Sequence, residues 1–372
     1  MMRDKSLFPN VRFFGKPTGM SGYGYATRHI AKSFSESSIP TYFHSKEAYF
    51  EGMSTCGPNC NVDFYIHTPP FSRHKSSNYK IGYFYWETDK IPASWAKDVC
   101  NSLDEIWVPC KLVESACRRA GFLGPIEVVH TPYSDSVRSE RVSIPAFGSS
   151  SSVLSEACYV FYSVFQWNVR KGYRDLLKAY MQEFSSNESV CLLIKTNPIN
   201  HKLHGDSRIN SDILEAKSGF NKASLPPIFL VKDKLSDSHL KGLHDLGNCF
   251  VLPHRGEGWG MPIHDAMNSG SLIITTRFGG ITEHLDETNS LLINHTMEHV
   301  TPMTWNDYYS SDQRWARPSV EHLRYLMRKA YEQDFDQMIP YRAKRLGESF
   351  SIKSFSRIAE NILIKRKKQG AF

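Results

Sequence analysis

The sequence contains no long apolar run. No segment of the 372 residues approaches the roughly 18 uninterrupted apolar residues that a membrane-spanning helix needs. The N-terminal residues MMRDKSLFPNVRFFGK also lack the apolar core of a signal peptide. We therefore expect a cytoplasmic protein, whose contact with a membrane, if it has one, would be peripheral and on the cytosolic side.

Matched cysteine pairs are missing too, although the chain has 8 cysteines. Cys158, Cys191 and Cys249 fall in or beside apolar runs that are typical of strands, which predicts buried free thiols in a reducing compartment. Cys56 and Cys60 could form half of a metal site, but no second pair matches them. The cysteines therefore predict neither a disulfide framework nor a metal centre.

No large excess of charge of either sign is present. The formal net charge is +7, and apolar residues make up 41% of the chain, as in soluble globular proteins. This mild basic bias suits phosphate-bearing ligands or an anionic membrane surface, but it is too small to indicate nucleic-acid binding. The length is too great for one ordinary core and predicts two domains.

What the sequence does contain is a regular alternation of strand-like and helix-like segments. In the first part, short apolar runs that predict strands alternate with longer amphipathic segments that predict helices: strands at 11–14, 40–44, 62–66, 80–86, 104–108 and 126–129, helices at 22–36, 92–101 and 111–120. A polar, serine-rich stretch at 146–157 then predicts a linker.

The alternation resumes after this stretch. Its predicted elements are strands at 159–165, 190–195, 228–231, 249–252 and 272–276 and helices at 173–184, 236–246 and 262–269. A helical tail follows from about 319 to 366. Two successive β/α runs joined by a linker predict two doubly wound domains with parallel sheets.

The segment HRGEGWGMPIHDAMNSG, residues 254–270, places two acids beside a glycine turn. Gly258 and Gly260 would let the backbone approach a ligand, and amides at the start of the following helix can bind an anion or sugar hydroxyls. Glu257 and Asp265 stand on either side of this cradle, which suits a ligand with hydroxyls and phosphate. The alternative is a helix-start acid favoured by the helix dipole, together with one solvated acid.

Two further segments could bind phosphate. Arg170 and Lys171 follow the strand at 159–165, where adjacent cations can neutralise a diphosphate, although a solvated turn would also explain them. Gly22 and Gly24 open a helix after the first strand. The full dinucleotide-binding fingerprint is not met, because Thr27 stands where its third glycine belongs.

Together these segments resemble retaining glycosyltransferases of the GT-B fold, in glycosyltransferase family 4 (glycosyl transferases group 1), which use nucleotide-sugar donors. The resemblance rests on SGYGYATRHIAKSF, YFYWETDKIPASW, FQWNVRKGYRDLLKAYMQEF, LPHRGEGWGMPIHDAMNSGSLIITTRFGGITEHL and WARPSVEHLRYLMRKAYE. It spans most of residues 19–335 and is most specific over 248–285.

The resemblance implies an α/β GT-B architecture in which two Rossmann-like domains face each other across a cleft. Residues 1–150 would form the acceptor domain and residues 151–348 the nucleotide-sugar donor domain. Residues 349–372 would form a C-terminal helix that could cross back to the first domain.

The resemblance also implies roles for the acids of an E-x7-E motif. Glu257 would contact the transferred sugar, and Asp265 would replace the glutamate that binds the ribose hydroxyls, with a side chain one methylene shorter. Backbone amides around Trp259–Met261, including Gly260, would bind sugar hydroxyls beside Gly258.

The diphosphate would be stabilised by Lys171 and Arg170, and approached by the loop with Gly22 and Gly24. Many family members carry a further basic residue six positions before the lysine, where this chain has Phe165. Arg170 could compensate for this missing cation. Adjacent side chains often diverge, however, so the residues alone leave open whether Arg170 reaches the same phosphate as Lys171.

The implied reaction is transfer with retention, through an oxocarbenium-like transition state. The donor's own phosphate would help to deprotonate the acceptor, and Glu87 would either face the acceptor or serve the structure. No metal or cofactor is implied. A GT-A-type Asp-x-Asp occurs only at 334–336, in an apparent helix, and His295 and His299 lie in a predicted loop.

The resemblance thus implies a metal-independent, retaining transferase of glycan or polysaccharide biosynthesis. Its partners would be a nucleotide sugar and a saccharide, lipid-linked or protein acceptor, with no nucleic acid. The alternative is a catalytically impaired nucleotide-sugar- or glycan-binding protein of the same fold. The basic run Lys365–Lys368 would be either solvated or a peripheral membrane contact.

Overall fold

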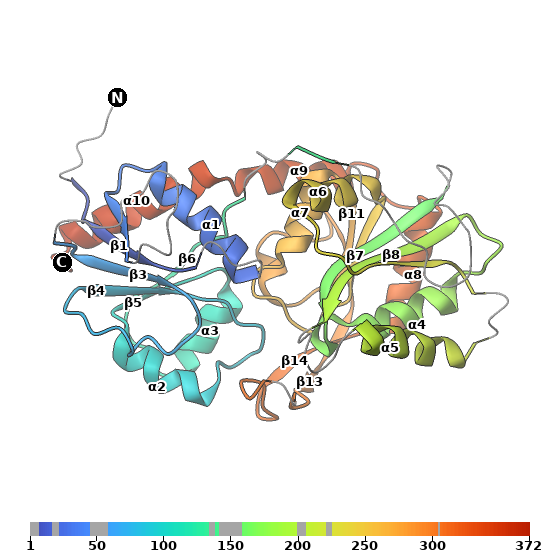
Figure 1. Ribbon diagram of the computed structural model, residues 1–372, viewed down its shortest axis with the longest axis horizontal. Helices are drawn as coiled ribbons and strands as arrows, with labels where there is room; N and C mark the ends of the chain where they lie inside the picture. Colours follow the sequence, from blue (N-terminus) through green and yellow to red (C-terminus); the bar gives the residue numbers. More distant parts are fainter. Residues whose placement is uncertain are drawn as a thin grey trace. The chain divides into compact units, whose positions relative to one another are not determined.

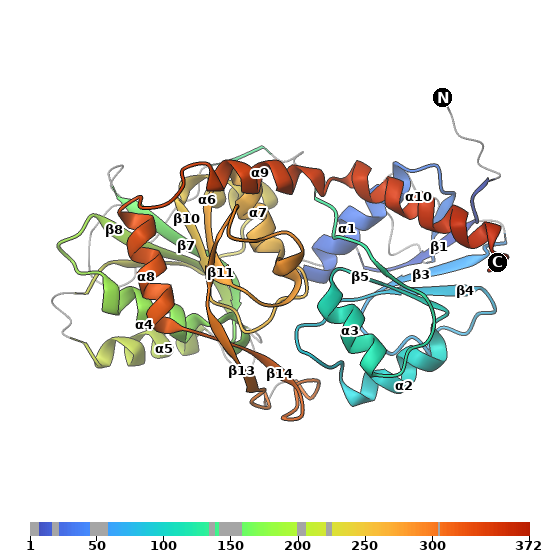
Figure 2. The ribbon, with the colours of Figure 1, turned by 180° about the vertical axis from the view of Figure 1, so that it is seen from behind.

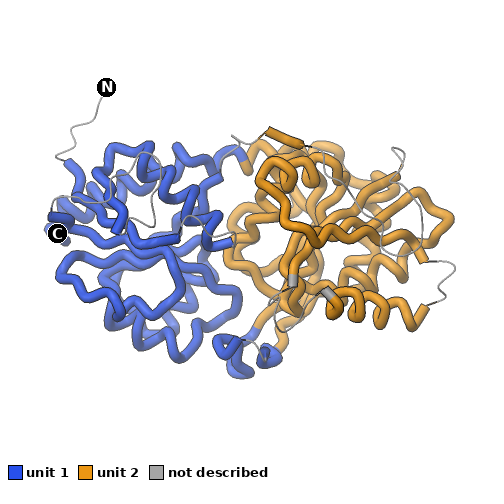
Figure 3. Tube along the Cα trace, viewed as in Figure 1, with its two compact units in different colours: residues 1–134, 299–314, 348–372 blue, residues 135–298, 315–347 orange. Residues whose placement is uncertain are grey.

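The chain divides into two compact units (Figure 3). The computed structural model describes residues 7–16, 22–44, 59–133, 138–140, 158–198, 206–220, 225–303 and 306–372. Unit 1 consists of Met1–Ser134, His299–Arg314 and Glu348–Phe372, and unit 2 consists of Asp135–Glu298 and Trp315–Gly347. The predicted linker at 146–157 and Cys56 lie outside the described residues.

Unit 1 is built on a six-stranded parallel sheet with strand order β2-β1-β3-β4-β5-β6. Its strands are β1 (Val11–Phe14), β2 (Thr41–Phe43), β3 (Val62–Ile66), β4 (Tyr79–Tyr83), β5 (Glu105–Val108) and β6 (Ile126–Val128). Helices α1 (Gly22–Ser35) and α10 (Ile352–Lys368) lie on one face, and α2 (Ala93–Ser102) and α3 (Lys111–Arg119) on the other (Figures 1 and 2). Cover on both faces explains why every residue of β3 and β5 is buried.

Unit 2 repeats this plan, with strand order β12-β11-β10-β7-β8-β9. Its parallel strands are β7 (Tyr159–Trp167), β8 (Val190–Pro198), β9 (Ile228–Val231), β10 (Cys249–Leu252), β11 (Leu272–Thr276) and β12 (Leu291–Ile293). Helices α4 (Tyr173–Glu183), α5 (Asp206–Ser218) and α8 (Val320–Tyr331) lie on one side, and α6 (Asp237–Leu246) and α7 (Met261–Ser269) on the other (Figures 1 and 2). The predicted pair of Rossmann-like domains is confirmed.

Two local predictions are wrong. His295–His299 is not a loop but strand β13, which pairs with β14 (Arg314–Pro318). Its residues are half-buried or exposed, so they lack the apolar alternation that marks a strand. Asp334 and Asp336 are not helical, because α8 ends at Tyr331 and α9 (Ile339–Ser349) begins later. The Asp336 carboxylate accepts hydrogen bonds from the Met338 amide and from Arg342, a local turn contact.

Helix α10 belongs to unit 1 and is anchored there by polar contacts. The Ser356 hydroxyl donates to the Ser33 carbonyl over 2.7 Å, and the Ser38 amide donates to Glu360 over 2.8 Å. Arg366 is buried and donates to Glu105 and Glu127, each over 2.7 Å. The run Lys365–Lys368 is therefore not uniformly solvated, since its arginine forms a buried ion pair.

Within the described ranges, no helix has both the length and the apolar content that crossing a membrane requires.

Candidate functional site

The turn between β7 and α4 is held in one tight conformation. Its residues Val169–Lys171 form a single 3-10 turn, which the Asn168 side chain caps by accepting from the Lys171 amide. Gly172 follows with φ of +72°, and a Cβ atom there would lie 1.8 Å from the Pro253 carbonyl oxygen. Only glycine fits both the backbone angle and this close approach. The turn is thereby packed against the carboxyl end of β10.

Arg170 and Lys171 converge on one carboxylate. The Arg170 guanidinium donates to Glu257 Oε1 over 3.1 Å and to the Gly256 carbonyl over 2.6 Å. The Lys171 ammonium donates to the same Oε1 atom. Adjacent side chains usually diverge, but the compact turn directs both toward the loop after β10. The turn thus places the Arg170 guanidinium at the same carboxylate as Lys171, and compensation by Arg170 for the cation missing at Phe165 stays a prediction.

Glu257 is 6% exposed and ionised. Burial alone would raise its pKa, but the neighbouring charges of Lys171 and Arg170 lower the pKa to about 2. The cluster of two cations and one carboxylate therefore keeps an excess positive charge at neutral pH. Such a cluster favours an anionic ligand, such as a diphosphate.

The loops after β10 and β11 touch through glycine backbones. A Cβ atom on Gly279, whose φ is +84°, would lie 2.5 Å from the Glu257 carbonyl oxygen, and one on Gly280 would lie 2.1 Å from that of Gly258. The Gly280 amide donates to the Glu257 carbonyl over 2.7 Å. This contact is not predicted from the sequence, although the adjacent glycines of Phe278-Gly279-Gly280 are a visible signal for it.

Gly280→Ala is expected to displace the loop that carries Glu257. Its Cβ would collide with backbone rather than with a flexible side chain, so one of the two loops must shift. We expect a loss of about 1–3 kcal/mol in unfolding free energy, measured by urea denaturation, and weaker ligand binding. Gly219→Ala is the control, because its Cβ would meet nothing within 4 Å. Equal effects of the two substitutions would contradict the prediction.

Helix α7 begins directly after the glycine turn. Gly260 precedes it with φ of +81°, and Gly270 ends it with φ of +80°. The helix starts at Met261, one residue before the predicted start at 262. Asp265 lies one turn further along and is half-buried. The site therefore combines a helix N-terminus with a carboxylate on the same helix.

Trp259 faces inward rather than toward solvent. It is 2% exposed, and its ring lies 4.5 Å from that of His284 and 5.9 Å from that of His264. The indole therefore anchors the turn through packing, and it is the backbone of this residue that remains for ligand binding.

Three buried polar side chains at this edge of the sheet lack a hydrogen-bond partner among the described residues. They are Thr196 at the end of β8, His254 after β10 and Thr276 at the end of β11. Burial lowers the pKa of His254 to about 3, so its imidazole is neutral. Unsatisfied buried groups are costly and rare, and these three lie at the edge where doubly wound sheets bind ligands. No sequence signal distinguished these residues.

Phe165 is part of the core of unit 2. It is 4% exposed and stacks on Trp167 at 5.8 Å between ring centroids. The described chain thus has a packed aromatic residue at the position where the family resemblance implies a further cation.

In unit 1, the predicted phosphate loop leads into α1. Gly22 is the first helical residue and Gly24 is buried. Between them, Tyr23 accepts a hydrogen bond from the Tyr85 amide over 3.0 Å, and their rings meet edge to face at 5.2 Å. The start of α1 therefore lies beside the segment that follows β4.

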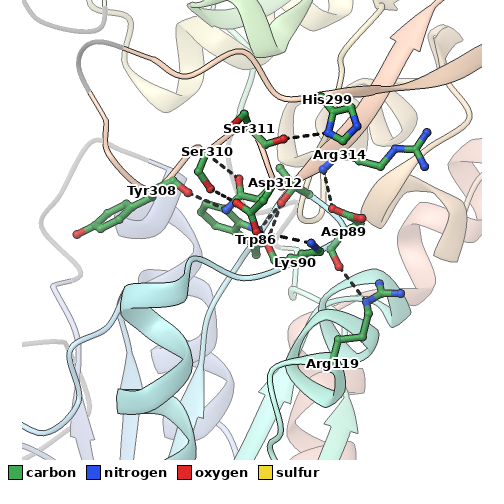
Figure 4. A network of polar contacts seen from close by, with 12 residues as sticks. Trp86, Asp89, Lys90, Arg119, His299, Tyr308, Ser310, Ser311, Asp312 and Arg314 are labelled. Carbon is green, nitrogen blue, oxygen red and sulfur yellow. Dashed lines mark hydrogen bonds and ion pairs between the residues drawn. The ribbon is translucent and has the colours of Figure 1, made fainter.

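Glu87 follows β4 and binds the inserted segment His299–Arg314 of unit 1. The Tyr309 hydroxyl donates to the Glu87 carboxylate over 2.9 Å, and the Tyr309 ring stacks on Trp86 at 5.1 Å. Figure 4 shows the adjoining network, in which the Arg314 amide donates to the Asp89 carboxylate over 2.6 Å. These contacts give Glu87 a structural role, and the acceptor role stays a prediction.

The predicted site residues therefore fall into two sets. Unit 2 holds the larger set, in which Arg170 and Lys171 contact Glu257: Arg170, Lys171, Glu257, Gly258–Met261 and Asp265. Unit 1 holds Gly22, Gly24 and Glu87. Over the part of the chain that the structure describes, no three His, Cys, Asp or Glu side chains are grouped so that they could hold a metal ion.

A family model matches the segment of unit 2 that holds Arg170, Lys171 and Glu257. Residues 159–300 match the family model for glycosyl transferases group 1, so the match runs from β7 through the Glu257 loop to β13. Comparison with curated protein sequences finds no match.

Solved structures with a similar fold cover nearly the whole chain. HepE of Anabaena, in complex with UDP and glucose, aligns with a TM-score of 0.65 at 12% identity, over 95% of this chain and 99% of that one. A trehalose-6-phosphate structure from E. coli with bound UDP-2-fluoro glucose aligns at 0.67 and 8% identity, over 95% and 98%. The pneumococcal O-GlcNAc transferase GtfA, in complex with UDP and GlcNAc, aligns at 0.54 and 11% identity, over 82% and 56%. The chain therefore has the GT-B fold, and its residues 159–300 match the glycosyl transferases group 1 family.

Proposed function

We propose that the protein is a retaining glycosyltransferase that moves a sugar from a nucleotide-diphosphate sugar to a saccharide, lipid-linked or protein acceptor. The observation that carries the proposal is the buried cluster of Arg170, Lys171 and Glu257 at the carboxyl edge of the unit 2 sheet. It lies inside the segment that matches the glycosyl transferases group 1 model.

The cluster suits the charges that develop during glycosyl transfer. The leaving diphosphate gains negative charge, which Arg170 and Lys171 would stabilise, while the sugar gains oxocarbenium character. With a pKa of about 2, Glu257 stays ionised and is a poor proton donor. We therefore propose that Glu257 accepts hydrogen bonds from sugar hydroxyls and stabilises the positive charge that develops on the sugar.

The remaining residues of unit 2 suit the rest of the donor. Backbone amides at the start of α7 would bind sugar hydroxyls or phosphate oxygens, and Asp265 would bind the ribose hydroxyls. HepE and GtfA are each described with UDP and a sugar, which favours UDP-sugars as the first donors to test.

A front-face reaction with retention fits the chemistry of these groups. Glu257 accepts from two cations, so it is poorly placed to act as a nucleophile, and the donor phosphate would instead take the acceptor proton. The two cations would supply the positive charge that a metal ion supplies in other transferases.

A second candidate is a nucleotide-sugar- or glycan-binding protein without turnover. Two observations favour it. The buried Phe165 stands where related transferases carry a further cation for the diphosphate, and Asp265 is one methylene shorter than the glutamate of the family motif. Binding of a nucleotide sugar without transfer or hydrolysis, across a panel of acceptors, would support this candidate over the enzyme.

The decisive experiment is a thermal-shift screen of nucleoside diphosphates and their sugars, followed by assays of donor hydrolysis and transfer. A ligand at 100 times its Kd should stabilise the native state by about 2.7 kcal/mol and raise Tm accordingly. Lys171→Met should weaken this shift for diphosphates, because it removes a cation from the cluster. If no nucleoside diphosphate or sugar nucleotide raises Tm, the proposal is wrong.

A further inference from the structure

Arg255, between His254 and Gly256 in the loop after β10, contacts three other parts of unit 2. Its guanidinium donates to the carboxylate of Asp175 on α4 over 2.7 Å and to the Val169 carbonyl over 3.2 Å. It also donates to the carboxylate of Glu298 on β13 over 3.1 Å. The Arg255 and Asp175 side chains are each 17% exposed, so water only partly screens these contacts.

The backbone of Arg255 is held as firmly as its side chain. The Arg255 amide donates to the Arg170 carbonyl over 2.6 Å, and its carbonyl accepts from the Ala316 amide over 2.8 Å. The Trp315 indole donates to the same Glu298 oxygen that Arg255 contacts, over 3.0 Å. Arg255 therefore joins the β10 loop, the β7–α4 turn and the β13–β14 pair.

The contacts of Arg255 help to hold the cluster of Arg170, Lys171 and Glu257 together, because these three residues come from two separate loops. Arg170 and Lys171 lie in the β7–α4 turn, whereas Glu257 lies in the β10 loop. A bound diphosphate would compete with Glu257 for the two cations. The Arg255 side chain joins the same two loops but contacts neither the charged groups of Arg170 and Lys171 nor Glu257. Its contacts therefore persist when a diphosphate displaces Glu257 from the two cations.

We propose that Arg255 is a positioning residue, which keeps Glu257 in register with Arg170 and Lys171 while the donor binds and reacts. Only the expected effect on kcat rests on the proposed function; the effect on the two loops does not. A lysine should not replace Arg255, because a single ammonium group cannot reach acceptors on α4, β13 and the β7–α4 turn at once.

The test compares Arg255→Ala and Arg255→Lys with Arg328→Ala. Arg328 is a matched control, because it also bridges carboxylates in unit 2, Glu183 on α4 and Glu188, but lies on α8. We expect both Arg255 variants to lose about 10- to 100-fold in kcat with little change in KM for the donor. Arg328→Ala should lower Tm and leave kcat within about twofold of the wild type.

A double-mutant cycle shows whether Arg255 acts through Glu257. In a Glu257→Gln background, Arg255→Ala should cause little further loss, because the group that it positions is already impaired. Fully additive losses, restoration by Arg255→Lys, or unchanged kcat in Arg255→Ala would each overturn the inference.

Hydrogen exchange separates this inference from the proposed function. Arg255→Ala should speed amide exchange at residues 168–172 and 254–258, and Arg328→Ala should not. If the wild type turns over no donor, the proposed function fails, and the exchange pattern alone decides the inference. Unchanged exchange in both segments would overturn it.

Discussion

Glu257→Gln is expected to lower the rate of sugar transfer by about 10²–10³-fold while leaving the fold intact. The substitution removes the negative charge that faces the developing positive charge on the sugar, yet the amide oxygen can still accept from Arg170 and Lys171. The effect should appear in kcat rather than in donor affinity, because the lost interaction strengthens only in the transition state.

The matched control for this prediction is Glu183→Gln. Glu183 is a partly buried carboxylate in the same unit, with a side chain 15% exposed against 7% for Glu257, and it is likewise paired with two cations, Arg324 and Arg328. Its loss should lower Tm with no effect on transfer. Circular dichroism and Tm measurements would show that both variants fold. Full transfer activity in Glu257→Gln would exclude the proposed mechanism.

Arg366→Met is expected to lower the free energy of unfolding by about 3–5 kcal/mol. The change leaves the Glu105 carboxylate, which is fully buried, without its cation. Equilibrium denaturation in urea would measure the loss. Glu105 would keep hydrogen bonds from Trp107 and Tyr79, but neutral donors compensate a buried charge only in part.

Two further variants test the cause of that loss. Lys368→Met removes an exposed cation from the same helix end and should change the free energy of unfolding by less than about 0.5 kcal/mol. The double substitution Arg366→Met with Glu105→Gln should recover part of the loss, because no uncompensated charge is buried. A loss below about 1 kcal/mol in Arg366→Met would contradict the prediction.

Most of the fold could be predicted because its central strands are buried on both faces. The predicted strands at 62–66, 228–231, 249–252 and 272–276 coincide with β3, β9, β10 and β11. Helix α5 was missed, because Ile209 and Ile213 are its only fully buried apolar residues and give little periodic signal. Strand β4 was predicted too long, because the apolar Phe84 and Trp86 pack against other side chains beyond the end of the sheet.

The residues of the candidate site could be predicted from the sequence, but the contacts among them could not. Glu257, Lys171 and the glycine turn have a recognisable spacing in the sequence. The convergence of Arg170 on Glu257 depends on the 3-10 turn and on the contact between Gly172 and Pro253, which are far apart in sequence. Arg255 and the buried Thr196 likewise acquire their surroundings only from tertiary contacts. Single-sequence patterns contain no information on such pairings.

The division of unit 1 among three chain segments has a consequence for the order of folding. During synthesis the segment Met1–Ser134 emerges first, but its buried carboxylate Glu105 and the ring of Phe34 receive their partners from Glu348–Phe372. All the chain that forms unit 2 has been made before those partners appear. The first unit to be translated is therefore the last to be completed, which reverses the usual N-terminal-first sequence. All six strands of its sheet lie in the first segment, but one face of that sheet must lack the cover of α10 until Glu348–Phe372 has been translated.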